Sequence, residues 1–361
     1  MTVRRKLAAI AALLSLADPT TAREPPLTSA NVAVVSVMTV PRSPIVTPPP
    51  TSKASSSLAG ERQWMIAEMR GVMANFAQIY FMPSPGVGAL LLAVLALADL
   101  SAAMTGLAAS VSASGFAIAL RMPRDRRRAG LIGYNGALTG IAFGALWQPD
   151  ASFAAWLTLC VGMSVVATAV LARYRIPALT GPFVVAMTVT WALRPWLDLL
   201  PRSGALACDA GTPGFVFCTV GQVVFIAPLV LGLLTWYVLA LGNVRATLWA
   251  LIAATTVWMI FTLMATPWPS MTVQMGGAGV NAFLAALGLG VFGRPPKLRL
   301  LGAMLAATIC VVLGTWLAPL RWPYFTLPFN LAVWLVLGIG AWRGHQAKQK
   351  TKQETKQKAT A

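Results

Sequence analysis

The chain has 361 residues, of which 57% are hydrophobic and only 11% are charged, and this composition excludes an ordinary soluble domain. A formal net charge of +18 would suit nucleic-acid binding in a soluble protein, but here the basic residues lie between apolar stretches, like the Lys and Arg of cytoplasmic loops. One histidine, His345, and four scattered cysteines are too few for a metal site. We therefore expect an all-α polytopic membrane protein in contact with lipid, without a metal, a cofactor or a nucleic-acid partner.

The first 60 residues differ from the rest of the chain. The stretch "PRSPIVTPPPTSKASSS" is rich in Pro and Ser and predicts a disordered arm. The preceding "MTVRRKLAAIAALLSLADPTTA" has the basic start, short apolar core and small-residue end of a cleaved secretory signal. An amino-terminal extension is the alternative, and we favour it because the topology below places the following segment in the cytoplasm.

Ten apolar runs follow, each close to the roughly 20 residues that a helix needs to cross a bilayer. They cover residues 76–96, 101–120, 130–147, 153–172, 178–197, 221–241, 246–265, 277–292, 300–318 and 324–342. We expect about ten transmembrane helices, with re-entrant half-helices as an alternative in the Pro- and Gly-rich segments. Residues 345–361 are rich in Lys and predict a basic cytoplasmic tail.

Three polar landmarks occur twice, in the same order and at nearly one separation. The pairs are Gln78 and Gln222, Asn135 and Asn281, and Thr180 and Thr326. Such self-similarity predicts two homologous halves, residues 62–203 and 204–344.

Charge indicates how the two halves are oriented. The loop at 121–128 carries five Arg, whereas its counterpart at 267–274 carries no basic residue. Conversely, residues 294–299 include three basic residues, whereas their counterpart at 148–153 has none. Equivalent loops therefore lie on opposite sides of a cell (inner) membrane, because cytoplasmic loops collect Lys and Arg. We expect an inverted repeat of two five-helix halves with both termini in the cytoplasm, and its substrate site near the midplane.

The motif "IPALTGPF" recurs as "WPYFTLPF" 146 residues later. Pro182 and Pro328 cannot donate a backbone hydrogen bond, so we expect free carbonyls at Ala178 and Tyr324. Such groups are tolerated at membrane depth only inside protein or along a polar cavity. With a Thr hydroxyl beside them, they suit a small neutral solute that donates hydrogen bonds. The alternative is that each Thr only satisfies the carbonyls that Pro releases, and the symmetric recurrence argues against it.

Ionisable groups are scarce within the apolar region. Asp99 is the only carboxylate well inside it, near the end of a predicted span, whereas ion-coupled carriers use intramembrane ionisable residues. Passive conduction is therefore favoured over an ion-coupled carrier of an amino acid or amide, and over an enzyme. A channel for another small solute, such as ammonia, is an alternative that the sequence leaves open.

Cys208 and Cys218 flank a loop expected outside the cytoplasm, where a disulfide between them is one interpretation.

Three paired segments carry a resemblance to a known family. They are "IPALTGPF" with "WPYFTLPF", "GLIGYNGAL" with the degraded "GGAGVNAFL", and "QIYFMPSPGVG" with the weaker "GQVVFIAPLVLG". Over about residues 62–344 the chain resembles the urea transporters, which are channel-like facilitators. The resemblance implies a homotrimer with one central pore in each protomer, conducting urea or a close small neutral amide.

The resemblance also assigns residues. The implied substrate pathway comprises Gln78, Ile79, Tyr134, Leu138, Thr180, Gln222, Val223, Val280, Leu284 and Thr326. The implied structural positions of the pore motifs are Asn135, Pro182, Phe183, Asn281, Pro328 and Phe329. The resemblance also implies two aromatic clamps that hold planar urea in the pore. Val280 occupies the place of an aromatic residue in one of these clamps, and Ser84 and Ala227 replace the Asn of an Asn-Pro motif. These changes imply an altered selectivity or a clamp supplied by another side chain.

Overall fold

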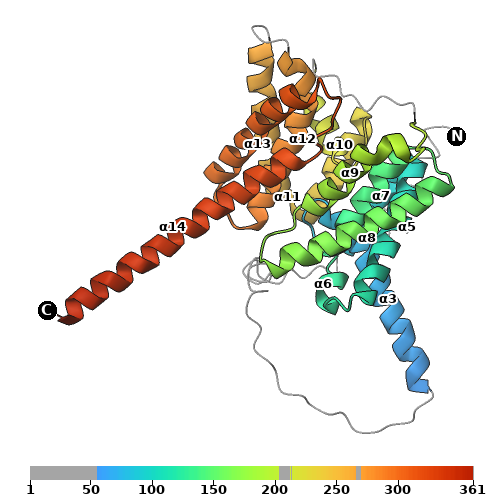
Figure 1. Ribbon diagram of the computed structural model, residues 1–361, viewed down its shortest axis with the longest axis horizontal. Helices are drawn as coiled ribbons and strands as arrows, with labels where there is room; N and C mark the ends of the chain where they lie inside the picture. The colour runs from blue at the N-terminus through green and yellow to red at the C-terminus, as the bar shows by residue number, and fades with distance from the viewer. Residues whose placement is uncertain (1–54, 203–211, 213, 266–269, 361) are drawn as a thin grey trace.

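The computed structural model describes residues 55–202, 212, 214–265 and 270–360, and its regular structure within those ranges is helical. The helices pack side by side in a bundle, from which the end of α14 projects (Figure 1). In chain order they are α3 (Ser55–Gln78), α4 (Pro85–Ala98), α5 (Leu100–Ala119), α6 (Arg124–Arg128), α7 (Tyr134–Leu146), α8 (Ala151–Arg173), α9 (Gly181–Leu193), the 3-10 turn η3 (Arg194–Trp196), α10 (Phe215–Gln222), α11 (Leu229–Ala265), α12 (Ser270–Val291), α13 (Pro296–Leu317) and α14 (Leu327–Thr360).

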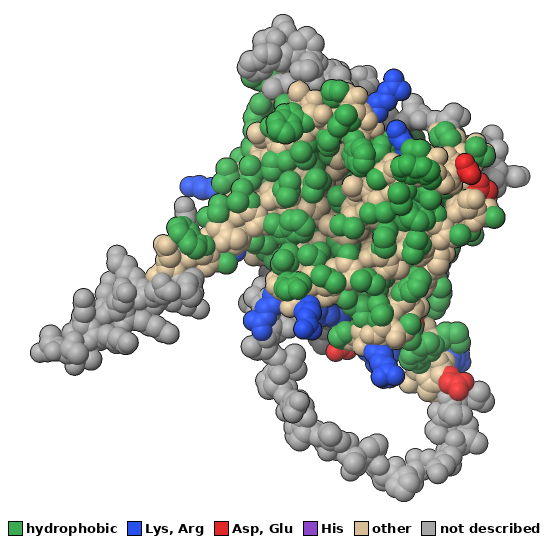
Figure 2. Space-filling view, in the orientation of Figure 1, with side chains coloured by type: hydrophobic (Ala, Val, Ile, Leu, Met, Phe, Trp, Pro, Cys, Tyr) green, Lys and Arg blue, Asp and Glu red, His purple; other side chains and the backbone are tan. Residues whose placement is uncertain are grey.

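The surface of the bundle is that of a membrane protein. Among the described residues, four helices are long and apolar enough to cross a bilayer, namely α5, α8, α11 and α13. Shorter apolar helices lie in α4, α12 and α14. Figure 2 shows hydrophobic side chains across the middle of the visible face, with Lys and Arg gathered mainly along its lower edge. Hydrocarbon accommodates such an apolar belt, whereas basic residues favour its polar margin.

Several expected spans are broken into shorter helices. The span expected at 76–96 divides at residues 79–84, between α3 and α4, and the span expected at 221–241 divides at residues 223–228, between α10 and α11. Phe81 and Phe225 have φ values of 60° and 62°, and this left-handed conformation ends a right-handed helix. Apolar residues occur within both breaks, so the apolar runs alone give no sign of them.

Ser84 begins the helix after the first of these breaks. Its hydroxyl accepts a hydrogen bond from the Val87 amide at 3.3 Å, and Pro85 occupies the first helical position, where a missing N–H is harmless. Ser84 thus caps α4 at the position where the family resemblance led us to expect Asn.

Other boundaries also differ from the expected ones. Helix α3 begins at Ser55, inside the expected arm. Helix α11 joins two expected spans across a non-helical Asn243. Helix α14 continues through the expected tail to Thr360, because Ala, Gln, Lys and Glu favour helix. Residues 1–54 and Cys208 lie outside the described residues, so the pairing of Cys208 with Cys218 stays a prediction.

Close packing against α5 fixes the position of α7, the helix that begins with two candidate site residues. Gly136, Gly140 and Gly144 recur every four residues along α7. A Cβ atom on Gly140 would lie 2.4 Å from the Ala109 Cβ and 2.5 Å from the Thr105 carbonyl oxygen. Small residues at such a stripe let two membrane helices approach closely, so α7 has little freedom to shift.

We predict that Gly140→Ala destabilises the protein by about 1–3 kcal/mol, because the added methyl group forces two rigid backbones apart. The measurement is the melting temperature of the purified protein in detergent. Gly115→Ala on α5 is the matched control, since a Cβ there meets no atom within 4 Å, and it should leave the melting temperature unchanged or slightly raised. Equal melting temperatures for the two variants would contradict this packing.

Candidate functional site

The two Pro-Thr motifs form two matching helix breaks. One follows α8 and ends where α9 begins, and the other follows α13 and ends where α14 begins. Leu179 and Phe325, each directly before the motif threonine, have φ values of 46° and 45°. The backbone therefore turns sharply at the same position of both motifs, before the next helix begins.

The prolines act differently from the prediction. Pro182 and Pro328 lie in the first turns of α9 and α14, where a helix needs no N–H donor, rather than inside a longer span. The carbonyls of Ala178 and Tyr324 accept hydrogen bonds from the Gly181 and Leu327 amides, both at 3.0 Å. The expectation of free carbonyls at Ala178 and Tyr324 is therefore wrong, because the turn itself pairs them.

Asn135 bridges the first break from the side. Its amide nitrogen donates to the Leu179 carbonyl oxygen at 3.0 Å, and its amide oxygen accepts from the Phe183 backbone N–H at 3.2 Å. The Tyr134 hydroxyl donates to the same Leu179 carbonyl. One buried side chain thus satisfies a donor and an acceptor that the broken helix leaves open.

Asn281 makes the matching bonds in the second half. Its amide nitrogen donates to the Phe325 carbonyl oxygen at 3.2 Å, and its oxygen accepts from the Phe329 N–H at 2.9 Å. Asn135 and Asn281 are both fully buried. We call these two side chains the asparagine bridges. Their bonds hold the loops of the two helix breaks in place.

The asparagine bridges bring the two motif threonines together. The hydroxyl oxygens of Thr180 and Thr326 lie 2.6 Å apart, and the two residues are 0% and 6% exposed. The rings of Phe183 and Phe325 meet edge to face, with centroids 5.6 Å apart. Residues 146 positions apart in the chain therefore form one buried polar contact. The pair Phe183 and Phe325, which we call the aromatic wall, joins the same two motifs.

Two tryptophans connect the halves, one by a bond to the first motif and the other by a bond to the residue just before the second motif. The Trp334 indole N–H donates to the Pro177 carbonyl oxygen at 2.8 Å, and the Trp191 indole N–H donates to the Arg321 carbonyl oxygen at 3.1 Å. Sequence reasoning missed both tryptophans, because they lie outside the repeated motifs. Their bonds fix the relative position of the two breaks.

The other predicted pathway residues lie around these breaks. Gln78 and Gln222 are the last residues of α3 and α10, and the Gln78 side chain donates to the Ala129 carbonyl oxygen at 3.0 Å. The buried members are Ile79, Tyr134, Leu138, Val223 and Leu284, whereas Gln222 and Val280 are partly exposed. Their roles in contacting a solute stay predictions.

Comparison with known families gives a match over residues 69–341, to the urea transporters. The chain belongs to the urea transporter family. This match confirms the resemblance read from the paired motifs. Membership implies passive transport of urea across a membrane, and it makes this urea transporter a transport protein rather than an enzyme.

The second half of this urea transporter holds residues that differ from their counterparts in the first. Asn330 follows the second Pro-Phe pair, where the first half has Val184, and it is fully buried beside the two motif threonines. Tyr324 stands where the first half has Ala178. A comparison of the two halves residue by residue would have signalled both substitutions, although not their position at the contact between halves.

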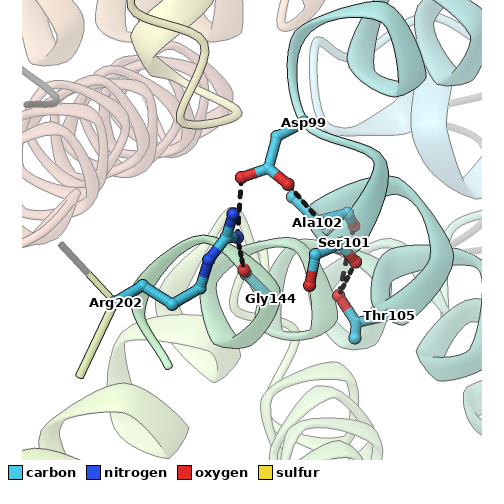
Figure 3. A network of polar contacts seen from close by, with 6 residues as sticks. All are labelled: Asp99, Ser101, Ala102, Thr105, Gly144 and Arg202. Atoms are coloured by element: carbon cyan, nitrogen blue, oxygen red, sulfur yellow. Dashed lines mark hydrogen bonds and ion pairs between the residues drawn. The ribbon is translucent and has the colours of Figure 1, made fainter. Parts of the chain in front are cut away.

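Asp99, the acidic residue of the transporter's apolar region, makes two structural contacts. One Asp99 carboxylate oxygen accepts from the Ala102 amide at 3.1 Å and so caps α5, and the other lies 2.8 Å from a guanidinium nitrogen of Arg202. Arg202 also donates to the Gly144 carbonyl oxygen at the end of α7 (Figure 3). Asp99 thus ties three segments together at the end of the first half.

We predict that Asn135→Ala lowers the stability of the transporter by about 1–3 kcal/mol, because it leaves the Phe183 N–H buried without a partner. The melting temperature in detergent reports the change. Gln148→Ala is the control, because Gln148 is an exposed amide whose loss should alter stability by no more than about 0.5 kcal/mol. If Asn135→Ala melted like the control, the bridge would not support the break.

We also predict that Asp99→Asn and Arg202→Met are coupled. Asn at position 99 retains a capping oxygen but loses the ion pair with Arg202. Each single variant should therefore lower the free energy of unfolding by only about 1 kcal/mol, because both side chains are partly exposed and solvent weakens their attraction. Melting temperatures of the two single variants and the double variant form the test. The double variant should be no less stable than Arg202→Met alone. Independent, additive losses would show that the ion pair contributes nothing.

Proposed function

We propose that this urea transporter conducts urea passively along a pathway that passes the contact between Thr180 and Thr326. The observation that carries the proposal is this buried hydroxyl pair, 2.6 Å apart, at the meeting point of two matching helix breaks. A hydroxyl both donates and accepts a hydrogen bond, so it matches both the carbonyl and the amino groups of urea. No solute fits between oxygens at this distance, so the hydroxyls separate as urea passes.

An inverted repeat of two five-helix halves is part of the proposal. The bonds of the asparagine bridges and the left-handed turns recur at a separation of 146 residues. The opposite distribution of Arg and Lys over equivalent loops supports the inversion. Symmetry of this kind places equivalent residues of both halves near the membrane midplane, which is where a shared threonine contact is expected.

Tyr324 is our candidate for the aromatic residue that Val280 does not supply. Its hydroxyl oxygen is the atom nearest to a Cβ placed on Gly277, at 2.1 Å, so the ring lies against α12 one turn before Val280. We propose that this ring forms the second aromatic wall of the pathway. On the family resemblance we further propose a homotrimer in the cell (inner) membrane, with both termini of each protomer in the cytoplasm.

Passive conduction predicts urea flux without an ion gradient. Stopped-flow light scattering on proteoliposomes under an inward urea gradient should give flux above that of empty vesicles, unchanged by a sodium or proton gradient. Thr180→Val and Thr326→Val should each lower urea flux by about tenfold, because each loses one hydrogen bond of about 1.4 kcal/mol to the solute. A separate run measures water permeability.

Thr158→Val is the matched control for this experiment. Thr158 is exposed on α8 and its hydroxyl bonds to the Ala154 carbonyl of its own helix, so its loss should leave urea flux unchanged. Flux that required an ion gradient would indicate a coupled carrier instead. Urea flux equal to that of empty vesicles, with passage of ammonia or another amide, would retain the channel and reject urea as its solute.

A further inference from the structure

Asn330 joins the threonine contact from the second half. Its side chain is 0% exposed. The amide nitrogen donates to the Thr180 hydroxyl oxygen at 2.9 Å and to the Thr326 carbonyl oxygen at 2.7 Å. Asn330 therefore contacts the motif threonine of each half, yet it belongs to neither repeated motif.

The Asn330 amide oxygen has no hydrogen-bond partner among the described residues, although it is buried. Its orientation follows from the Thr326 carbonyl, which only accepts hydrogen bonds and so requires the amide nitrogen to face it. The oxygen lies on the other side of the amide group, near Gly181, where a Cβ would be 3.8 Å from it. A buried acceptor without a donor is unfavourable, so this atom needs a donor from elsewhere.

The fold of the motif does not require this amide. The backbone N–H of Val184 donates to the Thr180 carbonyl at 3.0 Å, and the N–H of Asn330 donates to the Thr326 carbonyl at 3.2 Å. The two residues thus hold equivalent places in the two breaks. The first half forms the same turn with the apolar side chain of Val184. The side-chain amide of Asn330 is therefore not needed to form the turn and has another role.

Proton counting shows what this cluster offers to a solute. The amide nitrogen of Asn330 uses one acceptor position of the Thr180 hydroxyl, and one threonine hydroxyl donates its proton to the other. The remaining hydroxyl proton has no acceptor among the described residues, so it is available to a solute. The cluster therefore presents one O–H donor and one amide-oxygen acceptor, which complement the C=O and N–H groups of one amide edge.

We propose that Asn330 binds the permeating solute directly, with its amide oxygen accepting an N–H of urea or of a similar small primary amide. This inference rests on the proposed function and deepens it, because it adds a specificity residue on one half only. Solutes that carry an amide N–H satisfy the buried oxygen during passage, and solutes without a donor leave it unpaired.

Asn330→Val, which copies the first half, should lower urea flux through proteoliposomes by about tenfold, the equivalent of one lost hydrogen bond. The decisive variant is the exchange Val184→Asn with Asn330→Val, which moves the amide to the equivalent position of the other half. It should restore at least half of the wild-type urea flux. Asn330→Leu, closer to Asn in shape, serves as a second single variant where Asn330→Val does not fold.

Two results would overturn the proposal. Urea flux of Asn330→Val or Asn330→Leu equal to wild type would show that the amide oxygen does not bind urea. Lowered flux that the exchange variant fails to restore would leave Asn330 as a positioning residue for the two threonines. Failure of the proposed function is distinct, because the wild-type protein would then conduct no urea. Thr158→Val is again the control expected to conduct as wild type.

Discussion

Backbone polar groups inside a bilayer must find partners within the protein, and the two helix breaks of this transporter depend on how that need is met. Asn135 and Asn281 meet it by pairing one carbonyl and one N–H across each break. Each break can then hold its threonine at the contact between the halves. The hydroxyl pair, its aromatic wall and the tryptophan ties all require these breaks in their present positions.

Both close helix packing and polar side-chain bonds position the site. The glycine stripe of α7 sets how closely that helix approaches α5, and Asn135 at its first turn reaches the break from there. Asp99 and Arg202 close the other end of the first half. The site is therefore held by side chains from helices far apart in sequence, which suits a pathway whose polar groups must keep their orientation as a solute exchanges bonds with them.

The repeated motifs predicted the family and the residues that meet at the centre. They did so because the same Pro, Thr and Asn residues recur in both halves at one separation. Helix breaks at Phe81 and Phe225 were not predictable from hydropathy, since apolar residues continue through them. The role of Asn330 depends on a contact between the halves, and only the folded chain brings it to Thr180.

The contact between Thr180 and Thr326 is most directly tested by cross-linking. In the double variant Thr180→Cys with Thr326→Cys, oxidation should join the two sulfurs, stop urea flux through proteoliposomes, and allow recovery after reduction, whereas either single variant should be unaffected by oxidation. Side chains already in contact need little movement to form a disulfide. Two results would contradict this account: the sulfurs fail to join, or the cross-linked protein conducts urea as fast as it does after chemical reduction. In either case the pathway would not pass between these threonines.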